Sequence, residues 1–66
     1  KDNASIKRDI LAATALNVKF MIFDQYNHQD IKPIYNKYIK LFKLDKVKTY
    51  NTSNGLLLVT NTSYEG

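Results

Sequence analysis

The sequence has no cysteine and no tryptophan, and it contains one histidine, one proline and two glycines. Without cysteine, neither a disulfide framework nor a cysteine-ligated zinc site can form. Metal sites and nucleophilic triads need several convergent histidine, cysteine or acidic side chains, and His28 lies alone in a polar stretch. We therefore expect no enzyme here: no catalytic residue, no metal ligand and no cofactor.

Long apolar runs are also absent. No uninterrupted run exceeds four residues, whereas a transmembrane helix needs about 20, so we expect no membrane span. The chain begins Lys-Asp-Asn-Ala-Ser, without an initiator methionine and without the apolar core of a signal peptide. We expect a fragment of a larger or processed protein, and the sequence leaves its compartment open.

The length of 66 residues suits one small domain, or a fragment of a larger one, covering residues 1–66. Its composition, 44% hydrophobic and 24% charged, is typical of a folded domain. Because glycine and proline are scarce, we expect a few continuous elements. The patterns described next predict an α+β fold, with one long or two short N-terminal helices, a second amphipathic helix and a C-terminal antiparallel β-hairpin.

The N-terminal third has a helical spacing of apolar residues, which predicts a helix over about 5–26, either one long helix or two short ones broken near Asn17. Its main stripe comprises Ile6, Ile10, Ala13, Leu16, Phe20 and Phe23, and a second ridge comprises Leu11, Val18 and Ile22. The competing interpretation is a strand over 18–23, where apolar residues also fit an alternating pattern. We favour the helix because residues 12–16 are rich in alanine.

The segment 31–43 has the clearest amphipathic pattern and predicts the second helix. Asp30 is placed to cap its start, and Pro33 lies in the first turn, where no N–H is needed. The apolar stripe comprises Ile31, Ile34, Tyr35, Tyr38, Leu41 and Phe42. Lysines occupy the opposite side of this helix.

After Asp45 the apolar spacing changes to an alternation, which predicts a hairpin over about 47–61. Asn54-Gly55 is the pair favoured in a two-residue type I′ turn, because both positions need a positive φ. This turn predicts Tyr50 opposite Val59 and Lys48 opposite Asn61.

Positive charge is concentrated in one part of the chain, since residues 31–50 carry six lysines against one acidic residue, Asp45. Such a region attracts polyanions. The order of helices followed by a hairpin resembles a winged helix-turn-helix, which implies a helix in the major groove of DNA and a wing on the backbone. The residues that would bind nucleic acid are Lys32, Asn36, Lys37, Lys40, Lys43, Lys46 and Lys48.

Two functions follow from these patterns. The first is a non-enzymatic interaction module, a protein-binding or structural fragment, because the two ridges of the first helix and the two-sided hairpin need more cover than 66 residues supply. Its expected cover is a protein partner, a parent chain or a second copy in a homodimer. The second function is a small winged-helix-like nucleic-acid-binding protein. We rank protein ahead of nucleic acid as the partner.

Overall fold

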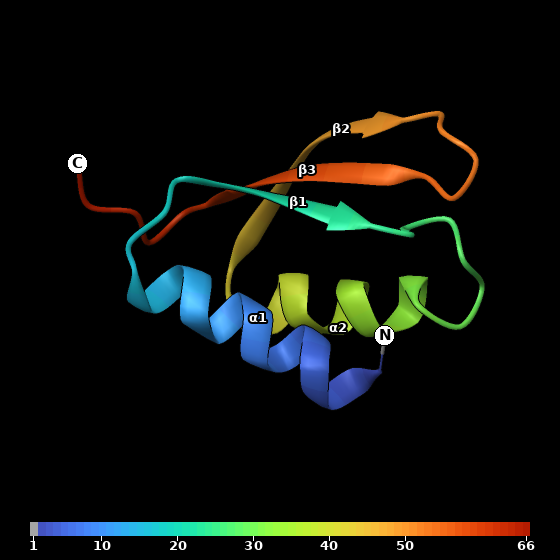
Figure 1. Cartoon of the computed structure of the whole chain (residues 1–66). Helices are drawn as coiled ribbons and strands as arrows, with labels where there is room; N and C mark the ends of the chain where they lie inside the picture. The colour runs from blue at the N-terminus through green and yellow to red at the C-terminus, as the bar shows by residue number, and fades with distance from the viewer. Residues whose placement is uncertain (1) are drawn as a thin grey trace.

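A computed structural model describes residues 2–66, which form two helices and three strands (Figure 1). In chain order they are α1 (Asn3–Ala15), β1 (Phe20–Asp24), α2 (Lys32–Leu41), β2 (Leu44–Tyr50) and β3 (Leu56–Asn61). The predicted α+β class is confirmed, because the helices are combined with an antiparallel sheet.

The strands form one sheet in the order β1-β3-β2, so the last of them in the chain lies in the middle. β3 is antiparallel to both neighbours, and Leu58 lies opposite Ile22 of β1 and Lys48 of β2. Leu57 and Val59 are fully buried, whereas Leu58 between them is half-buried. β3 thus supplies both the central hydrogen-bonding partner and the middle of the core.

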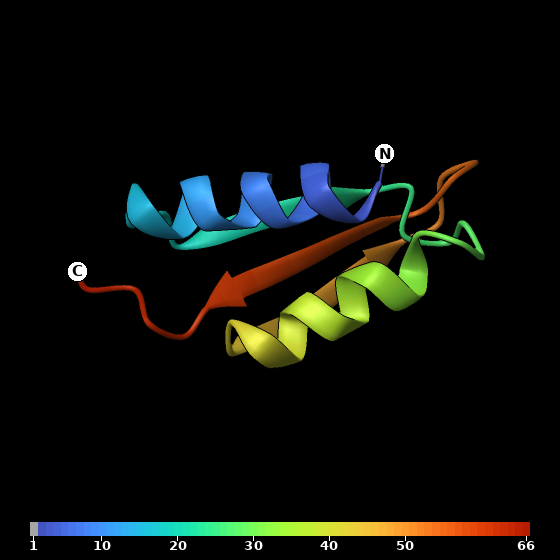
Figure 2. The same ribbon diagram turned by 90° about the horizontal axis from the view of Figure 1, so that it is seen from below.

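Both helices lie on the same side of the sheet, with α1 running along β1 and α2 along β2 (Figures 1 and 2). The core fills the space between the two layers. Its buried apolar residues are Ile6, Ile10, Met21, Phe23, Tyr26, Ile31, Tyr35, Tyr38, Ile39, Leu44, Leu57 and Val59. Nothing among residues 2–66 covers the opposite face of the sheet, which we call the outer face.

The prediction of a helix continuing to residue 26 is wrong. α1 ends at Ala15, and 20–24 is strand β1, in agreement with the competing interpretation. The burial of β1 alternates, with Met21 and Phe23 directed into the core. Pairing with β3 gives this segment a hydrogen-bond ladder. The partner residues are distant in the sequence, so the local pattern of apolar residues does not reveal this pairing.

Asn17 ends the first helix. Its φ of 56° lies in the left-handed region, which asparagine tolerates better than most residues. The Asn17 N–H donates to the Thr14 carbonyl at 3.1 Å, and the Val18 N–H donates to the Ala13 carbonyl at 3.2 Å. These two bonds constitute a Schellman motif, which satisfies the last carbonyls of the helix and turns the chain toward β1.

α2 confirms the second predicted helix, with Pro33 in its first turn and with Tyr35 and Tyr38 buried. Two details of the prediction are wrong. Asp30 does not cap the helix, because Ile31 occupies the N-cap position and makes no side-chain capping bond. Leu41, placed in the apolar stripe, is 59% exposed, because the helix ends there and directs the residue away from the sheet.

β2 and β3 confirm the hairpin, but its turn and register differ from the prediction. Residues 51–55 form a five-residue loop, and Tyr50 pairs with Leu56 instead of Val59. Gly55 has a φ of 80°, whereas Asn54 is not among the residues with positive φ. Asn27, from the loop after β1, donates its N–H to the Asn54 carbonyl at 3.0 Å, so a distant segment helps to hold this loop.

Asn17→Val should lower the free energy of unfolding by about 1–2 kcal/mol, because a β-branched side chain is strained in the left-handed region. Asn17→Gly is the matched control. Both variants lose the two bonds of the Asn17 side chain to the Glu65 backbone, at 2.7 and 3.1 Å, but glycine keeps the backbone unstrained. Urea unfolding followed by circular dichroism measures both. An equal loss in the two variants would contradict the strain at Asn17.

Gly55→Ala should destabilise the fold by about 1–3 kcal/mol, because of its positive φ and a steric contact. A Cβ at this position would lie 2.6 Å from Cγ and Nδ2 of Asn27. The same substitution should cost less in an Asn27→Gly background, where that side chain is absent. Thermal unfolding of the four proteins in this cycle measures the difference, and identical penalties in both backgrounds would show that the contact is not made.

Candidate functional site

Apolar side chains are exposed on the outer face of the sheet. Phe20 and Ile22 of β1 point there, because the residues that alternate with them are buried. Phe20 is 53% exposed and Ile22 is 65% exposed. Leu56 and Leu58 lie opposite β1 on β3 and are half-buried. A contiguous apolar surface of this kind is typical of an interaction site.

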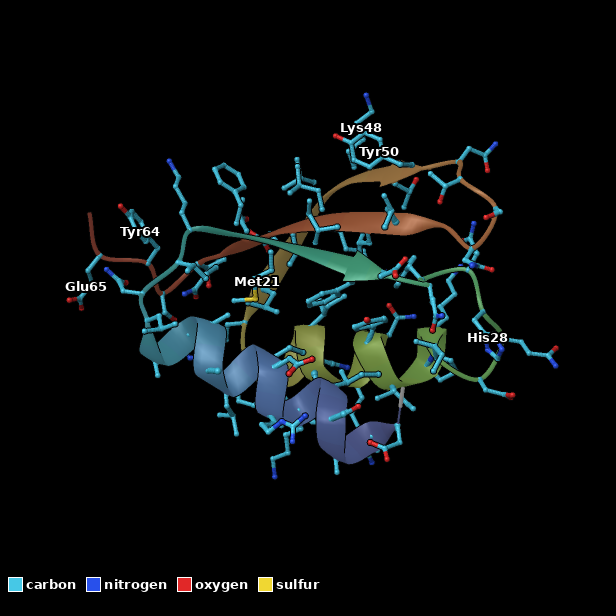
Figure 3. The ribbon with its side chains drawn as sticks, viewed as in Figure 1. Met21, His28, Lys48, Tyr50, Tyr64 and Glu65 are labelled. Atoms are coloured by element: carbon cyan, nitrogen blue, oxygen red, sulfur yellow. The ribbon has the colours of Figure 1, made fainter. Side chains whose placement is uncertain are left out.

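The outer face changes character toward β2. Lys48 and Tyr50 project from this strand away from the helices, whereas Met21 of β1 points toward them (Figure 3). The Lys48 Nζ lies 5.1 Å from the centre of the Tyr50 ring, within the range of a cation–π contact. The outer face is therefore apolar at β1 and basic and aromatic at β2.

The two edges of the sheet also differ in charge, with a charged β2 edge and a mainly apolar β1 edge. The β2 edge carries Asp45, Lys46 and Lys48, and its register on β3 shifts between the two lysines. Charged side chains and such a bulge are the usual means by which an edge strand is kept from pairing with another chain. The β1 edge has no such bulge, and its one charged residue, Asp24, stands at the end of the strand after four apolar residues, 20–23. Only one edge is therefore protected.

The backbone of β1 presents hydrogen-bonding groups at this unprotected edge. The Asn61 N–H donates to the Lys19 carbonyl at 2.8 Å, which fixes the phase of the β1–β3 ladder. Residues in phase with Lys19 direct their N–H and C=O groups toward β3, and the alternate residues direct theirs away. Phe20, Ile22 and Asp24 therefore offer their backbone groups to solvent.

A groove lies along the same edge, between β1 and α1. Its volume is about 290 Å³, and its walls are formed by α1 and by residues 20–23. α1 contributes Ile6, Asp9, Ile10 and Ala13. Ligand pockets commonly span about 300–1,000 Å³, so this groove is suited to one or two apolar side chains. We call the β1 edge and this groove together the β1 surface.

The predicted nucleic-acid-binding residues lie at the other side of the molecule. Lys32, Lys37 and Lys40 are exposed on α2, and Lys43 occupies the turn before β2 with a φ of 56°. Asn36 is half-buried, and its Oδ1 accepts a hydrogen bond from the Tyr26 hydroxyl at 2.6 Å. The Oδ1 of Asn36 is therefore engaged within the fold, and the basic part of the α2 surface is formed by its lysines.

Two lysines from different elements converge on one aromatic ring. The Nζ atoms of Lys32 and Lys46 lie 5.1 and 5.7 Å from the centre of the Tyr26 ring. A hollow of about 470 Å³ adjoins this ring and is lined by Lys32 and by residues at the end of β2 and in the loops, although the Tyr50 side chain itself projects to the outer face. We call the side chains of Tyr26, Lys32 and Lys46 the Tyr26 cluster.

The bulge in β2 places the last two predicted residues, Lys46 and Lys48, on opposite faces of the sheet. Lys46 pairs with Val59, whose side chain is buried in the core, whereas Lys48 pairs with Leu58 of the outer face. The extra residue, Val47, reverses the alternation between the two lysines. Lys46 therefore joins the Tyr26 cluster, and Lys48 joins the outer face.

Acidic partners are scarce for all these lysines. Among residues 2–66 the structure has one ion pair, between Arg8 and Asp9 at 3.9 Å, and it is exposed. Several lysines lie beside aromatic rings instead of carboxylates. The Lys37 Nζ, for example, lies 5.5 Å from the centre of the Tyr38 ring. The positive charge of α2 and β2 is therefore not neutralised within the fold.

The described residues form no group of three or more His, Cys, Asp or Glu that could hold a metal ion. The Nδ1 of His28 accepts a hydrogen bond from the Asp30 N–H at 3.1 Å in an exposed loop. At the N-cap of α1, hydrogen bonds from Ser5 lower the pKa of Asp2 below its usual value. No helix within residues 2–66 has the length and hydropathy needed to cross a membrane.

Comparisons with known protein families, with characterised proteins and with solved structures find no match.

The sequence prediction missed the β1 surface. The alternation of residues 18–23 was its only signal, and it was outweighed by the helical spacing of the same residues. The backbone groups of the edge become visible only when β1 is paired with β3, whose residues are far away in the sequence.

Proposed function

We propose that this chain is a non-enzymatic interaction module that binds a partner protein at the β1 surface. The observation that carries the proposal is the contrast between the two sheet edges. The β2 edge has charges and a bulge that discourage pairing, whereas the β1 edge exposes aligned backbone groups beside apolar side chains.

The energetics support binding at this surface. Burial of apolar area is worth about 25 cal/mol per Å², and Phe20 and Ile22 are more than half exposed in the free chain. The backbone groups of β1 add hydrogen bonds that any extended segment can complete, a recognition mode known as β-augmentation. Apolar area would supply affinity, and the groove beside it would select side chains.

Ile22→Lys should weaken binding at the β1 surface, because it places a charge on the apolar edge. Random peptides displayed on phage, selected on the wild-type protein, supply the ligands. Their affinity should fall by about tenfold or more in the variant, corresponding to a hot spot above 1 kcal/mol. Ile22 is 65% exposed, so its replacement should change stability by less than about 0.5 kcal/mol.

Leu41→Lys is the matched control for this experiment. Leu41 is 59% exposed on α2, away from the β1 surface, so selected peptides should bind this variant as they bind the wild-type protein. Selected ligands that are indifferent to Ile22→Lys, or a selection that yields no ligand, would reject the proposed site.

The Tyr26 cluster supports nucleic-acid binding as a second candidate function. Lys32 and Lys46 approach the Tyr26 ring without acidic partners, and a hollow adjoins this ring. Such surfaces usually combine lysines that track phosphates with exposed aromatic rings that stack bases. The Tyr26 ring is buried, so the ring available for stacking is Tyr50, which is 40% exposed beside Lys48 on the outer face. We rank this function second because exposed lysines are stable on a surface without any ligand.

The salt dependence of DNA binding tests the second function. With about four to six phosphate contacts, log affinity for duplex DNA should fall against log salt with a slope of about −0.9 per phosphate. Lys32→Ala combined with Lys46→Ala, which removes both lysines of the Tyr26 cluster, should reduce the slope by about two. The control, Lys7→Ala combined with Arg8→Ala, removes the same charge from α1 and should leave the slope unchanged. Absence of binding at low salt would reject this function.

A further inference from the structure

We infer that the β1 surface accepts an extended segment of a separate partner protein, which pairs antiparallel to β1, places apolar side chains in the groove and carries an acidic residue at its carboxyl-terminal end. This inference rests on the proposed function and specifies the chemistry and direction of the ligand.

The backbone of β1 determines the form of the ligand. Phe20, Ile22 and Asp24 each present an N–H and a C=O at the edge, spaced for the closely paired hydrogen bonds of an antiparallel ladder. Antiparallel pairing is also the more stable arrangement per residue, and it continues the pattern of the existing sheet. A bound segment would therefore become a fourth strand next to β1.

The position of α1 argues against a second copy as the occupant. α1 runs along β1 on the inner side of the sheet (Figures 1 and 2). Two copies paired antiparallel through β1 would place their α1 helices over adjacent strands, about 4.8 Å apart, whereas packed helices need about 8–10 Å. A segment without its own helix layer avoids this clash.

The groove determines which side chains are favoured. In a paired strand, residues opposite Phe20 and Ile22 lie on the outer face, and the residues between them point toward α1. There they meet Ile6, Ile10 and Ala13, which line the groove, whereas the fourth α1 residue, Asp9, is exposed and paired with Arg8. The groove-facing positions of the ligand are therefore apolar.

The charges at the two ends of β1 determine the direction. Lys19 precedes the strand and Asp24 ends it, and neither forms an ion pair within the described residues. The Lys19 Nζ lies near the Phe20 and Tyr64 rings, 5.5 and 5.9 Å from their centres, at the start of β1. In an antiparallel ligand the carboxyl-terminal end lies beside Lys19, where an acidic residue is favoured, and the amino-terminal end lies beside Asp24, where a basic residue is favoured.

Two capped hexapeptides of identical composition test the direction. Lys-Val-Thr-Val-Thr-Glu places valines in the groove and matches both charges, whereas Glu-Val-Thr-Val-Thr-Lys reverses the charges. Titration at low salt, followed by NMR of the ¹⁵N-labelled protein, should show about three- to tenfold tighter binding of the first peptide, as expected for two exposed ion pairs. Lys19→Glu combined with Asp24→Lys should reverse this preference.

Peptide backbone methylation tests the pairing itself. N-methylation of the third residue removes the N–H that would bond the Ile22 carbonyl and should abolish binding. N-methylation of the fourth residue removes an N–H that faces away and should leave binding largely intact. Hydrogen exchange of the Ile22 amide should slow on binding, whereas the Met21 amide, directed toward β3, should be protected in the free protein as well.

The outcomes separate this inference from the proposed function. Peptides that bind without discrimination by charge or by methylation, but lose affinity in Ile22→Lys, would overturn the antiparallel acidic ligand and leave the proposed site standing. A dimer of the free protein in sedimentation, with the Ile22 amide already protected, would assign the edge to a second copy. Failure of both hexapeptides and of the displayed peptides would reject inference and proposed function together.

Discussion

Two helices cover one face of a three-stranded sheet, and this limit determines what the molecule exposes. Met21 and Phe23 are buried because they point toward the helices, and Phe20 and Ile22 are exposed because they point away. A domain of this size buries only about 60% of the surface of its unfolded chain. Its two helices cover one face of the sheet and leave the other face exposed. The apolar outer face is a direct result of this geometry.

The surface is divided between two sheet edges of opposite character. The apolar β1 edge adjoins α1, and the lysines are gathered around α2 and the bulged β2 edge. Repulsion among these lysines is tolerated because aromatic rings lie beside several of them, as Tyr26 does beside Lys32 and Lys46. The β1 surface and the Tyr26 cluster therefore lie toward opposite edges of the sheet.

Elements that depend on neighbouring residues were predictable from the sequence, and those that depend on distant residues were not. The pattern of 31–43 predicted α2 because its buried face repeats along the helix. Residues 18–23 fit both periods, and only pairing with β3 decides between them. The Asn54-Gly55 signal failed because Asn27 holds a wider loop, and burial of Leu57 and Val59 sets the register.

In the candidate site, too, the features set by neighbouring residues were predictable and those set by distant residues were not. The sequence placed Lys32, Lys37 and Lys40 on the exposed side of a helix, and the structure agrees with that placement. The separation of Lys46 from Lys48 depends on a bulge that has no local signal. The β1 surface required three facts that the sequence does not contain: the pairing of β1, its edge position and the place of α1 beside it.

The central position of β3 has a consequence for the order in which the chain assembles. A ribosome releases β1 some forty residues before its partner in the sheet, since Phe20 pairs with Thr60. During that interval the segment 18–23 lacks a ladder on either side, and its apolar spacing suits a helix as well as a strand. α2 and the β2–β3 hairpin, by contrast, are built from local contacts that close quickly. The arm formed by α1 and β1 is thus synthesised first, but β1 gains its ladder only after β3 has been made.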